Sequence, residues 1–269
     1  MLLLLPPSET KRDGGTEPAL DISSLAHPRL ATRRRAVVRA VARFAKTPDE
    51  MAASFKLGPK QAFEIKRNEV VTRSPTMPAI DRYTGVLYDG LDSATLSIAA
   101  RDRAHEIVRI HSAMLGLVAA LDMIPAYRLS YDSRLPELQL KAHWSDAVRR
   151  ELAQHPGLVL DLRSGGYAAL GPIPDDPRAV ALRVLARDET GEVRALNHFN
   201  KKAKGEFTRA LLGADELPDD VGSLLDWADA AGFELRPGAV GELELVTSSV
   251  HVGGGLRRTS PEVADGAGG

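Results

Sequence analysis

Residues 2–11 read LLLLPPSETK, and this stretch indicates the fold of the whole chain. Four consecutive leucines are typical of a β-strand that is buried on both faces of a sheet. Two prolines end the strand, and Ser8, Glu9 and Lys11 then follow at its carboxyl end. In α/β sheets that edge is where ligands bind. We therefore expect an α/β protein with a ligand site after its first strand, the alternative being an ordinary polar turn.

Other apolar patterns predict a mixed central β-sheet flanked by helices, an α/β (α+β) fold in one domain. Residues 157–162, GLVLDL, predict a second buried strand, and residues 233–235 and 242–246 predict two closing strands. The spacing of apolar residues predicts a helix over 28–45 and one long helix over 93–120. We expect residues 1–250 to form the domain and the Gly-rich residues 251–269 to be a disordered tail.

Composition excludes several classes of function. The 269 residues are 43% hydrophobic and 26% charged, which is typical of a soluble globular protein. No cysteine is present, which excludes disulfides and thiolate chemistry. Aromatic residues make up only 5%, which argues against an aromatic platform for single-stranded nucleic acid. Because the net charge is -1, a site for a polyanion must come from local clustering of cations.

No segment predicts a membrane span. The apolar run at residues 1–5 is too short to cross a bilayer and has no basic flank, so it does not resemble a signal peptide. We expect a cytoplasmic protein with no membrane partner.

The densest positive cluster lies at residues 197–209, NHFNKKAKGEFTR. Lys201, Lys202, Lys204 and Arg209 stand there beside a predicted helix start, whose free backbone N–H groups add to the positive potential. We interpret the stretch as a receptor for a phosphate or another anion, the alternative being a solvated helix start.

A second informative stretch is residues 121–135, LDMIPAYRLSYDSRL. Charged residues on an expected strand beside the core are costly unless they face a cleft or pair with one another. We therefore place Tyr127, Arg128 and Asp132 in the same cleft as the end of the first strand. Glu9, Asp89 and Asp132 are the candidates for acid–base chemistry. No metal-ligand spacing, dinucleotide fingerprint, P-loop or nucleophile elbow is present, so no cofactor is predicted.

Residues 47–67 read as helix, Leu-Gly-Pro-Lys turn, helix. This order resembles a helix-hairpin-helix, which holds DNA phosphates through backbone N–H groups. An ordinary connection between two helices is the alternative.

Taken together, these stretches resemble the YaaA family of bacterial peroxide-stress proteins. The matching pieces run in order over almost the whole chain. They are residues 7–11 (PSETK), 83–91 (YTGVLYDGL), 112–116, 121–129 with PAYRL at its end, 144, 160–167 and 200–205 (NKKAKG). The chain departs from the usual family pattern at residues 112–116, at residues 161–164 and at Lys204, where arginine is usual.

The resemblance implies a single α/β domain with a positively charged cleft and an embedded helix-hairpin-helix. It also implies DNA binding and a role in limiting oxidative damage and free intracellular iron. DNA, contacted with weak sequence preference, is the expected partner, and any effect on iron is expected to be indirect. The alternative function is an enzyme that acts on a nucleotide or nucleoside-like small molecule in the same cleft.

Overall fold

The four leucines that open the chain form the central strand of the sheet, β1 (Leu2–Leu5). The computed structural model describes residues 1–187, 193–194 and 199–248. β1 runs parallel to β4 (Val108–Ser112) on one side and to β7 (Val159–Asp161) on the other. Its leucines are at most 4% exposed. The prediction of a strand buried on both faces is therefore confirmed.

The central sheet is mixed, and its strand order is β10-β11-β8-β7-β1-β4-β5, with β9 paired to β8. Strands β1, β4, β7, β8 and β11 run parallel to one another, whereas β5, β9 and β10 pair antiparallel with β4, β8 and β11. A small second sheet has the order β2-β3-β6. The remaining strand bounds are β2 (Glu17–Ala19), β3 (Pro75–Pro78), β5 (Gly116–Ala119), β6 (Met123–Ile124), β8 (Ala179–Arg187), β9 (Val193–Arg194), β10 (Glu234–Pro237) and β11 (Glu242–Ser248).

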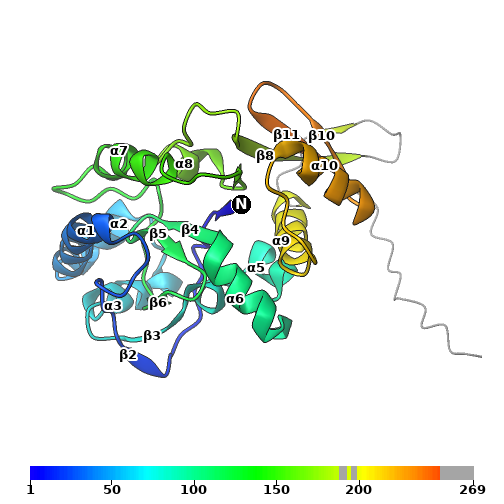
Figure 1. Cartoon of the computed structure of the whole chain (residues 1–269). Coiled ribbons are helices and arrows are strands. Elements are labelled where there is room, and N and C mark those ends of the chain that lie inside the picture. Colours follow the sequence, from blue (N-terminus) through cyan, green and yellow to red (C-terminus); the bar gives the residue numbers. More distant parts are fainter. Residues whose placement is uncertain (188–192, 195–198, 249–269) are drawn as a thin grey trace, which may run out of the picture.

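Helices cover both faces of the central sheet, with α1 and α7 on one side and α5, α6 and α9 on the other (Figure 1). The α-helices are α1 (Ala31–Phe44), α2 (Pro48–Ser54), α3 (Phe63–Glu69), α4 (Ala79–Arg82), α5 (Val86–Leu91), α6 (Ile98–Ile107), α7 (Leu140–Leu152), α8 (Gly165–Ala168), α9 (Phe199–Leu212) and α10 (Val221–Ala230). Short 3-10 helices are η1 (Pro28–Leu30), η2 (Pro59–Gln61) and η3 (Ser93–Thr95). The predicted mixed sheet flanked by helices is thus confirmed.

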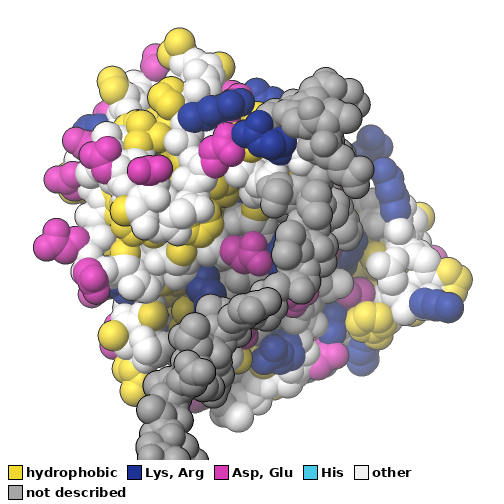
Figure 2. Space-filling view, turned by 90° about the vertical axis from the view of Figure 1, so that its right-hand side faces the viewer, with side chains coloured by type: hydrophobic (Ala, Val, Ile, Leu, Met, Phe, Trp, Pro, Cys, Tyr) yellow, Lys and Arg dark blue, Asp and Glu magenta, His cyan; other side chains and the backbone are white. Residues whose placement is uncertain are grey.

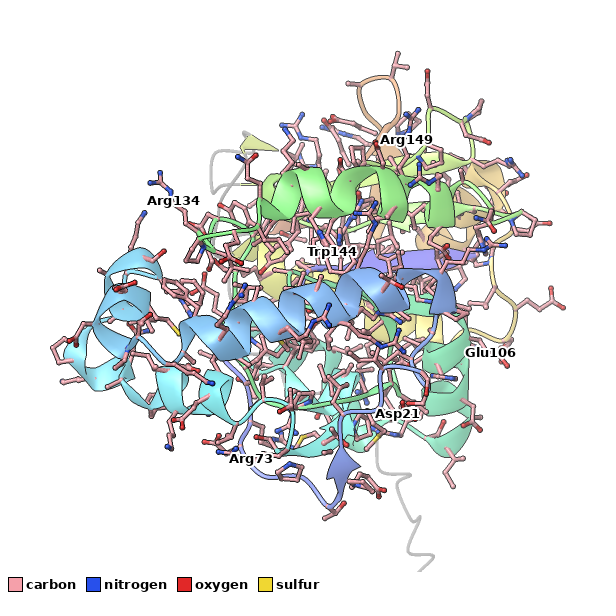
Figure 3. All side chains as sticks on the ribbon, turned by 90° about the vertical axis from the view of Figure 1, so that its left-hand side faces the viewer. Asp21, Arg73, Glu106, Arg134, Trp144 and Arg149 are labelled. Carbon is pink, nitrogen blue, oxygen red and sulfur yellow. The ribbon has the colours of Figure 1, made fainter. Side chains whose placement is uncertain are left out.

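Trp144 shows how the side formed by α1 and α7 is packed. Its indole ring is fully buried between these two helices (Figure 3), and its Nε1–H donates to the Ala113 carbonyl at 2.8 Å. A Cβ atom at Gly116, which has φ +67°, would lie 2.8 Å from the same ring. Buried side chains from all parts of the described chain join one hydrophobic core.

The prediction of one long helix over residues 93–120 is wrong. Helix α6 ends at Ile107, and β4 and β5 then form an antiparallel hairpin. The same apolar residues also alternate in this segment, and pairing with β1 gives their backbone groups hydrogen-bond partners. Likewise, only Met123 and Ile124 of the stretch 121–135 form a strand, and Tyr127 to Leu135 run as loop and turn.

Among the described residues, no helix has the length and apolar character that crossing a membrane requires. The tail predicted at residues 251–269 lies outside the described residues.

Candidate functional site at the carboxyl edge of the sheet

Three parallel strands of the central sheet end at one edge, and each brings polar side chains to it. Residues 6–11 follow β1, Ser112 ends β4 and residues 162–167 follow β7. Because parallel neighbours end on the same side of a sheet, these segments meet there. We call this region the carboxyl-edge site.

Lys11 shapes the loop that follows β1. Its side chain is buried and folds back, so that Nζ donates to the carbonyl oxygens of Ser8 at 2.9 Å and Glu9 at 3.2 Å. Nζ also lies 4.2 Å from the ring centroid of Tyr127. Burial lowers the pKa of Lys11 to about 7, because the charged amine is desolvated there. The predicted anion contact Lys11 is therefore an internal amine that is close to its titration point at neutral pH.

A chain of three hydroxyl groups lies behind this loop. Ser112 Oγ accepts the backbone N–H groups of Met114 and Leu115, and it lies 2.6 Å from the Tyr127 hydroxyl. Two accepted bonds use both lone pairs of Ser112 Oγ, so its own proton is donated to Tyr127. The Tyr127 hydroxyl then donates to Tyr83 at 2.7 Å. Tyr83 also interacts with Ser112, so the three hydroxyl groups form one buried cluster.

All five tyrosines of the protein surround the carboxyl-edge site. The Tyr88 hydroxyl donates to the Pro6 carbonyl at 2.9 Å, and the Tyr83 and Tyr88 rings lie 5.4 Å apart. Tyr131 and Tyr167 meet edge to face, with ring centroids 5.3 Å apart. Burial raises the pKa values of Tyr83, Tyr88, Tyr127 and Tyr167, so these hydroxyls stay neutral.

Arg128 reaches the site from the loop after β6. Its guanidinium pairs with the Glu9 carboxylate at 2.8 Å. The fully buried Asn68 holds the backbone of Arg128, donating to its carbonyl at 2.7 Å and accepting its N–H at 2.8 Å. The structure thus brings together Ser8, Glu9, Lys11, Tyr127 and Arg128, as the strand-end argument predicts.

A second group of hydroxyls lies at the entrance of the loop after β1. Thr10 Oγ1 lies 3.1 Å from Ser8 Oγ and accepts from Thr84 Oγ1 at 3.0 Å. Gly85 follows with φ +101°, a conformation that favours glycine. Ser8 is therefore one of several neutral donors and acceptors at this edge.

The described part of the basic stretch, residues 199–209, lies in α9, and its cations have different partners. Lys201 and Lys202 are exposed, and Lys202 lies 3.4 Å from the exposed Glu206. Lys204 instead donates to the Leu162 carbonyl at 2.8 Å, just beyond β7. Burial lowers the pKa of Lys204 to about 8, an effect opposed by Asp161. The amine of Lys204, predicted as an anion contact, fastens α9 to the sheet edge.

Arg209 also has a structural partner. Its guanidinium donates to the carbonyls of Leu91 and Asp92 at 2.9 and 2.8 Å and to Thr95 Oγ1 at 2.7 Å. These bonds satisfy carbonyls at the end of α5, so Arg209, predicted as an anion contact, also has a structural role.

Two glycines set the position of α9 against α5. A Cβ atom at Gly205 would lie 2.0 Å from the Leu87 carbonyl oxygen, and one at Gly90 would lie 2.6 Å from the Lys202 carbonyl oxygen. In the first turn of α9, Asn200 Oδ1 is inaccessible to solvent, and no donor reaches it within the described part of the chain. Close packing and the Lys204 bond therefore fix the basic turn at the carboxyl edge.

A buried charge network supports this edge from beneath. Arg163 donates to both oxygens of Asp161 at 2.8 and 2.7 Å and to Nδ1 of His111 at 2.7 Å. Burial, with the nearby Arg163 charge, lowers the pKa of His111 well below its usual value. His111 is therefore a neutral core residue, and the network joins β4 to the segment that follows β7.

The three acid–base candidates have different partners, although the charges of Glu9 and Asp132 both act on Tyr167. Glu9 is ion-paired with Arg128, and Asp132 accepts the Ser130 hydroxyl in a tight turn. Asp89 lies exposed on α5, and among the described residues no hydrogen bond or ion pair joins it to the other two.

The Leu-Gly-Pro-Lys turn does not confirm a phosphate-binding hairpin. Helices α2 and α3 do flank it, but the N–H groups of Leu57 and Gly58 donate to Ala52 and Gln61 within the segment. Within the described ranges, no group of three or more His, Cys, Asp or Glu side chains could hold a metal ion.

Charge is distributed unevenly on the face shown in Figure 2. Asp and Glu side chains predominate on its left and Lys and Arg side chains on its right. Local fields of opposite sign therefore coexist in a chain of net charge -1.

Comparisons with known proteins agree in covering nearly the whole chain. A family model described as peroxide stress protein YaaA matches residues 1–238. A UPF0246 protein of Corynebacterium efficiens is 39% identical over 253 residues, which cover 91% of this chain and 100% of the relative. A UPF0246 protein of Streptomyces coelicolor is 35% identical over 264 residues, covering 93% and 100%. One from Shewanella halifaxensis is 27% identical over 247 residues, covering 87% and 93%.

Proposed function

This chain belongs to the YaaA family of peroxide stress proteins, and we propose that it acts in that response by binding DNA at the carboxyl-edge site. The observation that carries the proposal is the placement of Lys201 and Lys202. Both are exposed on the first turn of a fourteen-residue helix, where backbone N–H groups and ammonium charges act on the same phosphate. DNA held at this edge is shielded from oxidants, and any effect on iron-driven damage is indirect.

The contacts favour recognition of the phosphate backbone over base sequence. Lysine ammonium groups act as point charges on phosphates and carry little sequence information. Because Lys204 and Arg209 are engaged within the protein, binding rests on few cations, and affinity is expected to be modest.

The test is a binding isotherm with duplex DNA at two salt concentrations. Replacing Lys201 and Lys202 with alanine should weaken binding roughly tenfold or more, and should reduce the salt slope by about two phosphate contacts. The matched control replaces Lys56 and Lys60, two exposed lysines of the turn between α2 and α3. Unchanged binding in the first variant together with loss in the second would move the site to that turn.

A second candidate function is an enzyme acting on a nucleotide or nucleoside-like molecule. It is favoured by the buried hydroxyl cluster of Ser112, Tyr83 and Tyr127 and by the buried amine of Lys11, which are more than a phosphate clamp needs. Glu9 is the acid–base candidate that lies beside these groups. Thermal-shift measurements with nucleotides and DNA oligomers discriminate the two functions, because an enzyme of this class is stabilised more by the small molecule.

A further inference from the structure

Tyr131 differs from the other four tyrosines of the carboxyl-edge site. Its residue is 43% exposed, whereas Tyr83, Tyr88, Tyr127 and Tyr167 are each at most 7% exposed. An exposed aromatic ring costs free energy in water, and one that is held rigidly beside a binding site offers a flat surface to a ligand.

The ring of Tyr131 packs against the short helix α8. A Cβ atom at Gly166 would lie 2.3 Å from the Tyr131 ring, so the ring rests directly on the backbone of α8. Tyr167 supports it edge to face at an interplanar angle of 67°. The absence of a side chain at Gly166 is what allows this seat.

The loop that carries Tyr131 is fixed at both ends. Asn68 binds both backbone groups of Arg128 on one side. On the other side, Ser130 N–H donates to Ser133 Oγ at 2.9 Å, and Ser133 N–H returns a bond to the Ser130 carbonyl at 3.1 Å. A ring held in this way loses little conformational entropy when a ligand stacks on it.

Cationic residues belong to the segments next to the one that carries this ring and the one that supports it. Arg128 is three residues before it, and the segment that carries Gly166 is fastened to the basic turn of α9 by the bond from Lys204 to Leu162. Phe63 offers the contrast: it is 51% exposed, but the Arg67 guanidinium lies 4.7 Å from its ring centroid and covers it. In the described part of the chain, no cation covers Tyr131.

We propose that Tyr131 is a stacking platform for one nucleobase of a single-stranded DNA segment whose phosphates are held by the α9 lysines. This inference rests on the proposed function and deepens it, because it names the form of DNA that the site prefers. Bases inside a duplex are already stacked on their neighbours, so only an unpaired or extruded base can reach the ring. The base of a free nucleotide could stack on Tyr131 in the same way, and the experiment distinguishes a nucleotide from single-stranded DNA.

The experiment compares binding of a short oligothymidylate, a duplex of equal length and thymidine monophosphate. Base–aromatic stacking predicts that Tyr131→Ala weakens oligothymidylate binding by about fivefold or more and leaves duplex binding nearly unchanged. Tyr131→Phe keeps the ring and should bind as the unmodified protein does. Gly166→Ala keeps the tyrosine but displaces its ring, and should reproduce the alanine loss; thermal unfolding shows whether this variant is folded. Phe63→Ala is the matched exposed-aromatic control and should change nothing.

Each outcome has one meaning. Unchanged oligothymidylate binding by folded Tyr131→Ala, while the protein still binds duplex DNA through the lysines, overturns the platform and leaves the proposed function standing. An equal loss on both DNA forms overturns it as well, because that pattern indicates a backbone contact. Binding of thymidine monophosphate through Tyr131 without any DNA binding supports the nucleobase site and overturns the DNA function. Binding of none of the three probes overturns both.

Discussion

Lys11 offers a quantitative test of the carboxyl-edge site through the pH dependence of stability. Burial lowers its pKa to about 7 in the folded protein, against 10.5 for an ordinary lysine. Between these values the unfolded chain binds a proton that the folded protein has released. Stability therefore rises with pH across this range, because the slope of the unfolding free energy follows the excess of protons bound by the unfolded state.

The magnitude follows from the same two pKa values. From about pH 6 to about pH 9 the folded amine deprotonates while the unfolded one stays charged, which increases the free energy of unfolding by about 3 kcal/mol. Lys11→Met removes the titrating group and nearly keeps the volume. The free energy of unfolding of the unmodified protein should therefore rise by this amount relative to the variant. The two carbonyl oxygens left without a donor add a cost that does not change with pH.

The assay is urea unfolding of both proteins at several pH values in this range, with Lys66→Met as the control for an exposed lysine. Other titrating groups are common to all three proteins and cancel in the differences. A difference between the unmodified protein and Lys11→Met that stays constant with pH would show that Lys11 keeps an ordinary pKa, and the internal-amine description would then be wrong.

Three further predictions concern the support of the site and are checked by urea unfolding. Gly205→Ala should destabilise the protein by about 3 kcal/mol or more, because the new methyl group overlaps a backbone carbonyl of α5; a loss below about 1 kcal/mol would contradict the close crossing. Arg163→Met should lower the free energy of unfolding by about 3–5 kcal/mol, because it leaves the Asp161 carboxylate buried and unpaired. The double variant with Asp161→Leu should recover most of the lost stability. Asn68→Ala should lower the free energy of unfolding by about 2–3 kcal/mol, because two hydrogen bonds to the loop backbone are lost. Replacing an exposed asparagine by alanine would change it very little.

Patterns of local burial in the sequence predict much of the sheet. The leucine run of β1, the run at 157–162 and the two closing strands are confirmed. β1 and β7 are buried throughout, which is why their apolar runs are the clearest of these patterns. The prediction for residues 93–120 is wrong because the spacing of their apolar residues fits both a helix and a strand. Only the pairing of β4 with β1, more than a hundred residues earlier, decides between them.

Strand ends predict part of the site, and tertiary packing supplies the rest. Ser8 and Glu9 follow from the rule that polar residues gather at the carboxyl edge, whereas Arg128 comes from the loop after β6, a strand of the second sheet. Tyr83 directly follows the short helix α4, and Tyr167 lies in the short helix α8. Helices this short have no apolar periodicity that would indicate which way a ring points. The low aromatic content also misleads, because it says nothing about where aromatic residues gather, and here the tyrosines share one edge. Lys204 and Arg209 were assigned from charge alone, which does not reveal internal acceptors.

The central position of β1 has a consequence for how the chain is made. Both of its partners lie far downstream, at Val108 and at Val159, so the four leucines leave the ribosome long before either strand exists. At about 5–20 residues per second, the wait for the first partner is roughly 5 to 20 seconds. During that time an apolar strand with two unpaired edges is exposed to every other nascent chain nearby. We expect the newborn protein to depend on a holding chaperone until β4 emerges, and its refolding from denaturant to be slow and sensitive to concentration.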